Sequence, residues 1–166
     1  MPIADTLIME LEREAQTTRR VLERVPTDKL AWKPHVKSMS LGRLAQHVAT
    51  IPGNISGMAR LDSFDVEKFA EPAALESTAA IVAAFDESLA QAKADLAATD
   101  DAAMMKNWSF SMGGKAIMTV PRIGVFRAIL LNHLYHHRGQ LTVYLRLLDV
   151  PVPSIYGPSA DENPFA

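Results

Sequence analysis

The chain has 166 residues, of which 48% are hydrophobic and 22% charged, and its formal net charge is −2. These values are typical of one globular domain with its own core, and they exclude a disordered chain and the basic surface that nucleic-acid binding requires. The sequence contains no cysteine, which excludes disulfides, thiolate metal ligands and a cysteine nucleophile.

The predicted elements are mainly amphipathic helices, in which apolar residues recur every three or four positions. The first helix covers residues 6–25, and its acidic start excludes a signal peptide. A connector with two prolines follows, and Ser38 or Ser40 is expected to cap the second helix, residues 41–61. A polar crossover then leads to the third helix, residues 77–98. No apolar run approaches the roughly 18 residues that a membrane span needs, so we expect a cytoplasmic protein.

The next segment breaks the helical pattern. Residues alternate in polarity on both sides of Gly113 and Gly114, and paired glycines supply the positive φ angles of a tight turn. Residues 107–121 therefore predict a short β-hairpin. The fourth helix is predicted over residues 121–148, and a proline-rich tail follows it.

Four long helices, each with one apolar stripe, predict an all-α fold: a four-helix bundle with a short β-hairpin insertion before the last helix. We expect residues 1–150 to form this single domain. Residues 151–166 are expected to form a C-terminal tail that packs on or near the bundle. The long second and third connections permit crossovers, so the order of the helices in the bundle stays open.

Three of the five histidines fall within five positions of the fourth predicted helix. At about 100° per residue, His137 lies about 40° from His133, in the middle of the apolar stripe, whereas His136 lies about 60° to the other side, at its edge. His47 lies within the apolar arc of the second helix. A histidine pair at i and i+4 can direct both rings at one point, and a third imidazole from a facing helix would complete a three-nitrogen metal site.

Three neutral ligands without a thiolate are typical of a catalytic metal centre with an open position, whereas closed structural zinc sites take four protein ligands. The alternative is that each histidine is a hydrogen-bonded core residue. Clustered buried imidazoles without partners would each cost roughly 1–3 kcal/mol, which favours a metal, but the spacing by itself leaves both interpretations open.

Three segments of the sequence resemble the bacterial DinB-like family, also called the DinB/YfiT-like metalloenzyme superfamily. They are LAWKPHVKSMSLGRLAQHVATIP, HLYHHRGQLTVYLRLLDVPVP and IYGPSADE. The resemblance covers nearly the whole chain and implies a four-helix bundle, commonly a homodimer, that holds one divalent metal with three histidines. Matched residue by residue, these are His47, His133 and His137. The family is unrelated to the translesion polymerase that shares its name.

The resemblance also implies a cofactor and a class of reaction. Members of the wider superfamily use zinc or nickel, and some are transferases that act with low-molecular-weight thiols such as bacillithiol or mycothiol. A chain without cysteine would have to take such a thiol as a cosubstrate. Imidazole suits several first-row metals, so the ligands alone do not select one.

Three further residues are expected near the metal. Gln140 and Tyr144 are on its side of the fourth helix, where each is expected either to hydrogen-bond to a ligand or to line the core. His136 belongs to the HHRGQ motif but not to the metal set that the resemblance implies, so we expect it to be a structural or supporting neighbour.

Several other polar and small residues are expected to have structural roles. Arg138 points away from the stripe and is expected to pair with a neighbouring helix or to contact a dimer partner. Gly139 is expected to allow another helix to pack closely. Asp161 and Glu162 in the tail could reach the site, but an exposed terminus is the simpler expectation.

Two classes of function fit these observations. The first is a metal-dependent enzyme acting on a small molecule, such as a thiol S-transferase or a hydrolase, with no catalytic residue assigned beyond the ligands. No Asp or Glu accompanies the histidines on the core-facing stripes, which favours direct attack by a metal-bound nucleophile over proton shuttling. The second is a non-enzymatic metal-binding homodimer, and a helical bundle without a metal is the remaining alternative.

Overall fold

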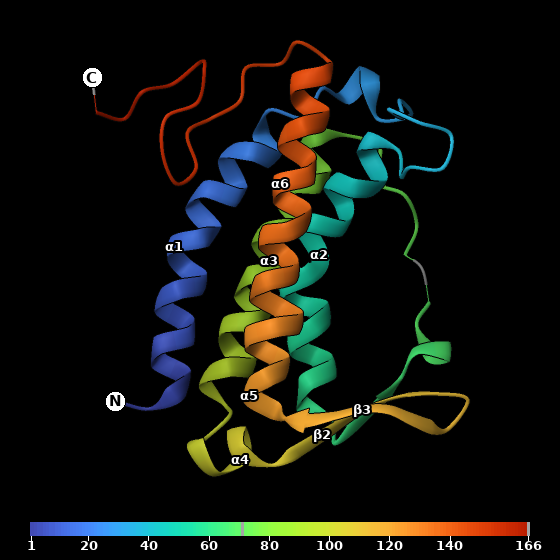
Figure 1. Ribbon diagram of the computed structural model, residues 1–166, viewed down its shortest axis with the longest axis vertical. Helices are drawn as coiled ribbons and strands as arrows, with labels where there is room; N and C mark the ends of the chain where they lie inside the picture. Colours follow the sequence, from blue (N-terminus) through green and yellow to red (C-terminus); the bar gives the residue numbers. More distant parts are fainter. Residues whose placement is uncertain (71, 166) are drawn as a thin grey trace.

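The computed structural model describes residues 1–70 and 72–165, and the protein is mostly helical with a small three-stranded sheet (Figure 1). Glu71, in the predicted crossover, and Ala166, at the end of the predicted tail, lie outside the described residues. The long helices are α1 (Ile3–Glu23), α2 (Leu41–Arg60), α3 (Thr78–Ala97) and α6 (Asn132–Leu147).

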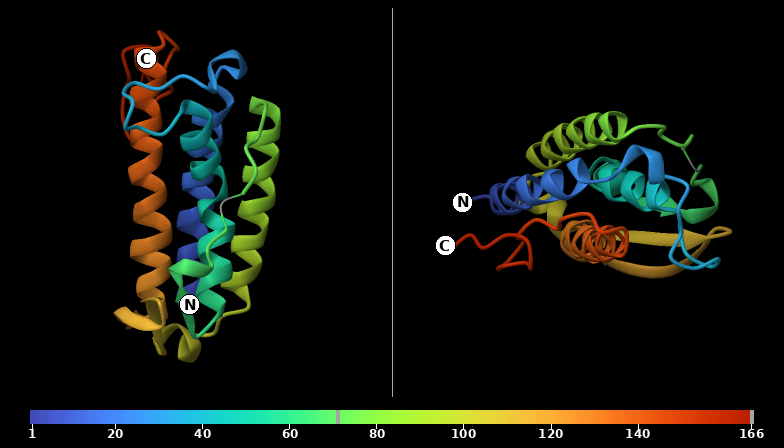
Figure 2. Two further views of the ribbon diagram at one scale, coloured as in Figure 1. Left: turned by 90° about the vertical axis from the view of Figure 1, so that its right-hand side faces the viewer. Right: turned by 90° about the horizontal axis from the view of Figure 1, so that it is seen from above.

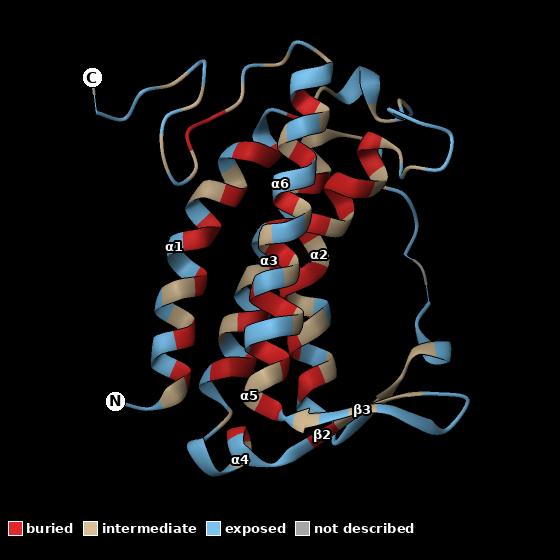
Figure 3. Cartoon of the chain, in the orientation of Figure 1, coloured by how far each residue is buried: buried red, intermediate tan, exposed pale blue. Residues whose placement is uncertain are grey.

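The long helices lie side by side, with α2 against both α3 and α6 and with α1 against α3 (Figure 2). Their buried faces meet in one apolar core, and the exposed residues lie mainly on the outer faces and in the connections (Figure 3). The predicted helical class is therefore confirmed. Among the described residues, no helix is long and apolar enough to cross a membrane.

Polar side chains fix where the helices begin. Ser40, one of the two predicted caps, accepts a hydrogen bond from the Arg43 amide at the start of α2. Ser77 does the same for α3 through the Ala80 amide. A short helix that the sequence did not predict, α4 (Asp101–Met105), begins at Asp100 in the same way. Each cap satisfies an amide that the first helical turn leaves without a partner.

The last helix is not uniform. A single turn, α5 (Arg122–Gly124), leads into a π-helical segment, η3 (Val125–Leu131), which continues directly into α6. The sequence predicted one regular helix over residues 121–148, and the structure corrects this at its N-terminal part. Because a π turn holds more residues than an α turn, the face of η3 is rotated relative to that of α6 just before His133.

The sheet corrects the prediction of a lone hairpin. Strands β2 (Asn107–Met112) and β3 (Lys115–Pro121) pair antiparallel around Gly113 and Gly114, both of which have positive φ as predicted. A third strand, β1 (Ser63–Asp65), adds to β2 in parallel. Strand β1 follows shortly after α2 and belongs to the stretch that the sequence predicted as a polar crossover. Two short 3₁₀ turns, η1 (Thr27–Lys29) and η2 (Val66–Lys68), complete the regular elements.

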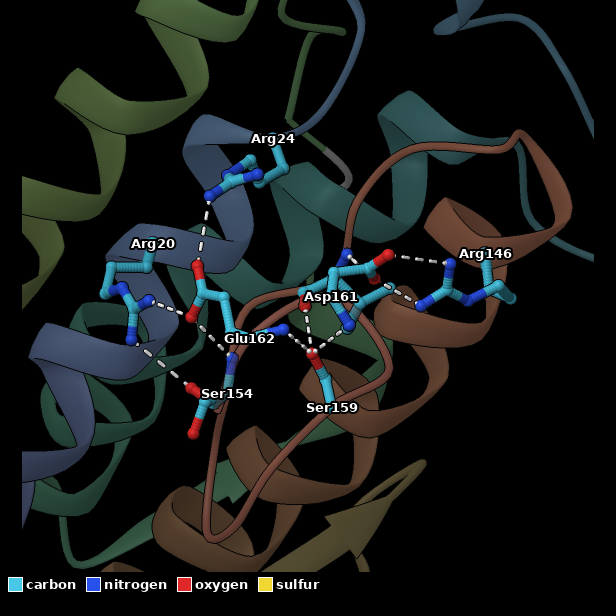
Figure 4. Close-up of polar contacts among 8 residues, drawn as sticks. Arg20, Arg24, Arg146, Ser154, Ser159, Asp161 and Glu162 are labelled. Atoms are coloured by element: carbon cyan, nitrogen blue, oxygen red, sulfur yellow. Dashed lines mark hydrogen bonds and ion pairs between the residues drawn. The ribbon is translucent and has the colours of Figure 1, made fainter. Parts of the chain in front are cut away.

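The tail is tied to two helices by its acidic side chains (Figure 4). Glu162 pairs with Arg20 and Arg24 of α1, and Asp161 pairs with Arg146 of α6. Asp161 is exposed, as expected, and Glu162 is half-buried; each carboxylate also accepts a backbone amide hydrogen bond from the tail itself, an ordering that the sequence did not predict.

Candidate metal centre

Three histidines meet between α2 and α6. His47 comes from the middle of α2, and His133 and His137 come from successive turns of α6, so the i, i+4 spacing places both rings on the face that packs against α2. The ring centroid of His47 lies 5.0 Å from that of His133 and 4.5 Å from that of His137. The centroids of His133 and His137 are 4.5 Å apart.

The nitrogens of these rings have a separation that suits a metal. The Nε2 atoms of His47 and His133 are 3.3 Å apart, and one nitrogen from each of the three rings lies within 4.8 Å of the others. Two nitrogens bound to one tetrahedral zinc at about 2.05 Å are separated by about 3.3 Å. The same separation also permits a hydrogen bond between two neutral rings. The convergence of all three rings fits a metal better, because a hydrogen bond between two imidazoles does not require a third imidazole nearby.

The surroundings keep the three imidazoles neutral. Burial, together with the charges of His137, His133 and Arg43, lowers the pKa of His47 to about 4. Burial likewise lowers the pKa of His133 and that of His137. A metal binds only the neutral form of imidazole, so at neutral pH each ring offers a lone pair without first losing a proton.

The Nδ1 atoms of His133 and His137 have different surroundings. His137 Nδ1 lies 2.8 Å from Gln140 Oε1, and in the tautomer in which Nδ1 donates, Nε2 keeps its lone pair for the metal. Of the two roles expected for Gln140, the structure thus shows a hydrogen bond to His137. The Nδ1 atom of His133 is buried, and the backbone of Ile129, one turn earlier, acts on this ring to raise its pKa against the effect of burial.

The other residues expected nearby stay outside the cluster. His136 is exposed and touches only the edge of the His137 ring, at a centroid distance of 4.8 Å. Tyr144 donates to the Met39 carbonyl and packs edge-on against Trp32, so it holds the connector before α2 instead of a ligand. Arg138 is buried and pairs with Glu14 of α1, which confirms the predicted pairing with a neighbouring helix.

No carboxylate joins the three histidines in the part of the chain that the structure describes. The two buried carboxylates found there are occupied elsewhere. Glu14 pairs with Arg138, and Asp95 accepts hydrogen bonds from Ser56 and Arg60. Among the described residues, the group that could hold a metal therefore consists of three imidazoles without an Asp or Glu.

An apolar pocket of about 230 Å³ opens beside His47 and His133. The sequence does not predict this pocket, because its walls come from the predicted connections and hairpin and from what reads as regular helix. Helix α2 supplies Met58, strand β2 supplies Trp108, and the π-helical segment supplies Ile129. The one available signal was the aromatic content of the two predicted non-helical segments.

These features define a class: a helical protein with a three-histidine candidate metal centre between two helices and an apolar pocket at its side. Comparison with known sequences then assigns the chain to a family. The chain belongs to the DinB family, whose sequence model matches residues 1–164.

Individual relatives agree with this placement. The chain is 28% identical to the uncharacterized protein YrdA of Bacillus subtilis over 161 residues, which are 95% of this chain and 90% of that protein. Two crystal structures of DinB-like proteins share the fold. One, from Bacillus cereus, has a TM-score of 0.71 at 21% identity and covers 93% of this chain and 98% of its own. The other, YjoA from B. subtilis, has a TM-score of 0.72 at 16% identity and covers 90% and 96%.

Proposed function

We propose that this protein is a four-helix-bundle metalloenzyme in which His47, His133 and His137 hold one divalent transition metal, zinc or nickel. The observation that carries the proposal is the convergence of three neutral imidazoles without a fourth protein ligand among the described residues. Three nitrogen ligands leave a coordination position open to a small molecule, as catalytic metal centres require.

The reaction that we favour is the transfer of a low-molecular-weight thiol to a second small molecule. A bound divalent metal would supply positive charge that lowers the pKa of a thiol or a water molecule at the open position. Two features of this chain support a thiol over water. The described residues place no carboxylate beside the histidines to take a proton from water, and the chain has no thiol of its own, so it would use one from solution.

The remaining residues of the site would orient a histidine ring and exclude water. Gln140 holds the His137 ring in one orientation through its Nδ1 atom. The apolar side chains next to His47 and His133 exclude water from one side of the site. Excluding water strengthens electrostatic interactions within a site and suppresses hydrolysis as a competing reaction.

The test is an activity assay on the intact chain loaded with zinc or nickel. Bacillithiol or mycothiol would be offered with an aromatic electrophile such as chlorodinitrobenzene, and nitrophenyl acetate would test for hydrolysis. We expect thiol transfer that disappears with a chelator and in His47→Ala, while a variant of an exposed histidine, His35→Ala, stays active. Ester hydrolysis alone would favour a metal-dependent hydrolase. Full metal binding with neither activity would favour a non-enzymatic metal-binding protein.

We further propose that the active form is a homodimer. Helix α6 carries an outer stripe of Gly139, Val143 and Leu147, in which both aliphatic side chains are more than half exposed. The expectation that Gly139 packs closely against another helix is wrong within one chain, because a methyl group built there would meet no described atom within 4 Å. A second copy of the chain would cover the stripe and bury its apolar surface.

A further inference from the structure

The apolar pocket beside the histidines is built by four separate parts of the chain. Met58 comes from α2, Phe64 from β1, Phe110 from β2 and Ile129 from the π-helical segment, while Phe69 closes the side next to η2. Two of the three histidines, His47 and His133, form its remaining edge. Anything held in this pocket is therefore in contact with the candidate metal centre.

The walls carry no charge. Apart from the two imidazoles, every side chain that lines the pocket is aliphatic, aromatic or a methionine. The one other polar atom of the lining, the indole N–H of Trp108, donates to the Met58 carbonyl and is thereby satisfied. Because a charged group loses its hydration on entering such a site without gaining a partner, the pocket selects against ions.

The size and shape of the walls limit the occupant further. Phe110 lies nearly parallel to both Phe64 and Trp108, at interplanar angles of 20° and 23°, so the three aromatic side chains stack in one row along the pocket. An apolar cavity of about 150 Å³ accommodates a benzene molecule. The pocket of about 230 Å³ therefore has room for one ring with a short substituent.

We infer that this pocket binds an uncharged apolar group of ring size, and that this group belongs to the electrophilic substrate and not to the thiol. The inference deepens the proposed function and rests on it, because the pocket adjoins the same histidines. Low-molecular-weight thiols of the cell are polar and carry charges, which the walls disfavour. They would therefore reach the metal from the side of His137, which does not line the pocket and whose neighbour Gln140 is exposed.

The experiment measures binding without catalysis. Fluorotoluene, fluorobenzoate and fluorobenzylammonium would each be titrated into the intact, metal-free chain and followed by fluorine NMR. We expect saturable binding of the neutral probe, and binding of either ion weaker by about tenfold or more. The same titrations with zinc present would show whether the neutral probe and the metal bind together, as the inference requires.

Two variants locate the binding. Phe69→Glu places a carboxylate at the rim of the pocket and is expected to weaken binding of the neutral probe about tenfold. Its matched control, Phe165→Glu, makes the same change at an exposed position of the tail and should bind like the wild type. Ile129→Trp fills the pocket and should abolish binding, with circular dichroism and thermal unfolding checking that the variant folds.

The outcomes separate this inference from the proposed function. Absence of saturable binding, equal binding of the ions, or wild-type binding by both Phe69→Glu and Ile129→Trp would overturn the inference, whatever the metal content. Binding of the neutral probe that follows the two variants, in a chain that takes up no metal, would uphold the pocket as an apolar ring site and refute the metal-dependent reaction.

Discussion

The hydrogen bond between His137 and Gln140 decides which nitrogen of one ring can face a metal. With Nδ1 occupied by Oε1 at 2.8 Å, the ring is held in place and Nε2 is left as the nitrogen available to a metal. Removing a hydrogen-bond partner of a metal-binding histidine typically weakens metal binding by about 10–100-fold. Gln140 is itself exposed, so its loss should leave the fold intact.

Gln140→Ala should therefore weaken zinc binding about 10–100-fold while changing the free energy of unfolding little. Competition with a chromophoric chelator would measure the dissociation constant. Tyr144→Phe is the matched control on the same helix, because the Tyr144 hydroxyl donates to Met39 and not to a histidine. Equal losses in the two variants would show that Gln140 acts only through the helix.

Arg138 stabilises the fold from the opposite side of the histidine helix. It is only 1% exposed, pairs with Glu14 and donates a hydrogen bond to the Thr18 hydroxyl. The Tyr156 hydroxyl of the tail completes the group by donating to Glu14. Removing one member of a buried ion pair leaves the other charge without compensation.

Arg138→Met is expected to lower the free energy of unfolding by about 3–5 kcal/mol. Denaturant unfolding followed by circular dichroism would measure the loss. Arg146→Met removes a partly exposed pair with Asp161 and should cost no more than about 1 kcal/mol. A loss for Arg138→Met as small as that of the control would contradict the structural role assigned to the buried pair.

At the scale of single elements, α6 has two faces with different tasks. Its inner face carries the histidine pair, and its outer face carries the exposed apolar stripe. Val143 and Leu147 are 58% and 57% exposed, so a charge at either position has little effect on the packing of one chain. The same charge would be buried in a dimer that covers the stripe.

Val143→Glu should therefore convert the proposed dimer to a monomer in size-exclusion chromatography with light scattering. Ile117→Glu on β3, at a comparable 55% exposure, is the control and should stay dimeric. A wild-type chain that is monomeric at all accessible concentrations, or a Val143→Glu variant that remains dimeric, would rule out this interface.

The tail contributes stability that depends on pH. The Arg146 pair and the Val152 amide lower the pKa of Asp161, and the Ser154 amide and the Arg20 pair lower that of Glu162. A carboxylate whose pKa is lower in the folded protein stabilises it above the unfolded-state pKa. That contribution is lost as the pH falls below the ordinary values of 3.8 and 4.5 toward the lower folded-state values.

The double variant Asp161→Asn with Glu162→Gln should therefore unfold at a lower temperature than the wild type at neutral pH. The difference should shrink as the pH is lowered through the range just below 4.5. Thermal unfolding of both proteins across this range would measure it. A difference that is the same at neutral and acidic pH would mean that the charges of the two carboxylates do not contribute to it.

For the molecule as a whole, the sequence predicted those parts that follow from periodicity. The stripes of α1, α2 and α3, the Ser40 cap and the glycine turn of the hairpin depend on residues close together in the chain, so local patterns reveal them. The i, i+4 pair of His133 and His137 belongs to this group, since one helix fixes their spacing.

The parts that escaped prediction depend on contacts between distant segments. Strand β1 has only three residues and forms because it lies beside β2, which pattern alone does not reveal. The π-helical segment has the composition of an ordinary helix, and nothing local distinguishes it. The ion pairs of Glu162 with Arg20 and of Asp161 with Arg146 join residues 142 and 15 positions apart, so the sequence does not reveal that the tail is tied to two helices.

The central claim is that His47, His133 and His137 bind one metal ion together, and metal content by inductively coupled plasma mass spectrometry tests it most directly. The wild type would be measured beside His47→Ala, His137→Ala and the neighbouring control His136→Ala, after incubation with zinc or nickel and removal of excess metal. We expect about one equivalent in the wild type and in His136→Ala, and none in the other two. A wild-type chain that takes up no metal, or ligand variants that retain it, would contradict the claim.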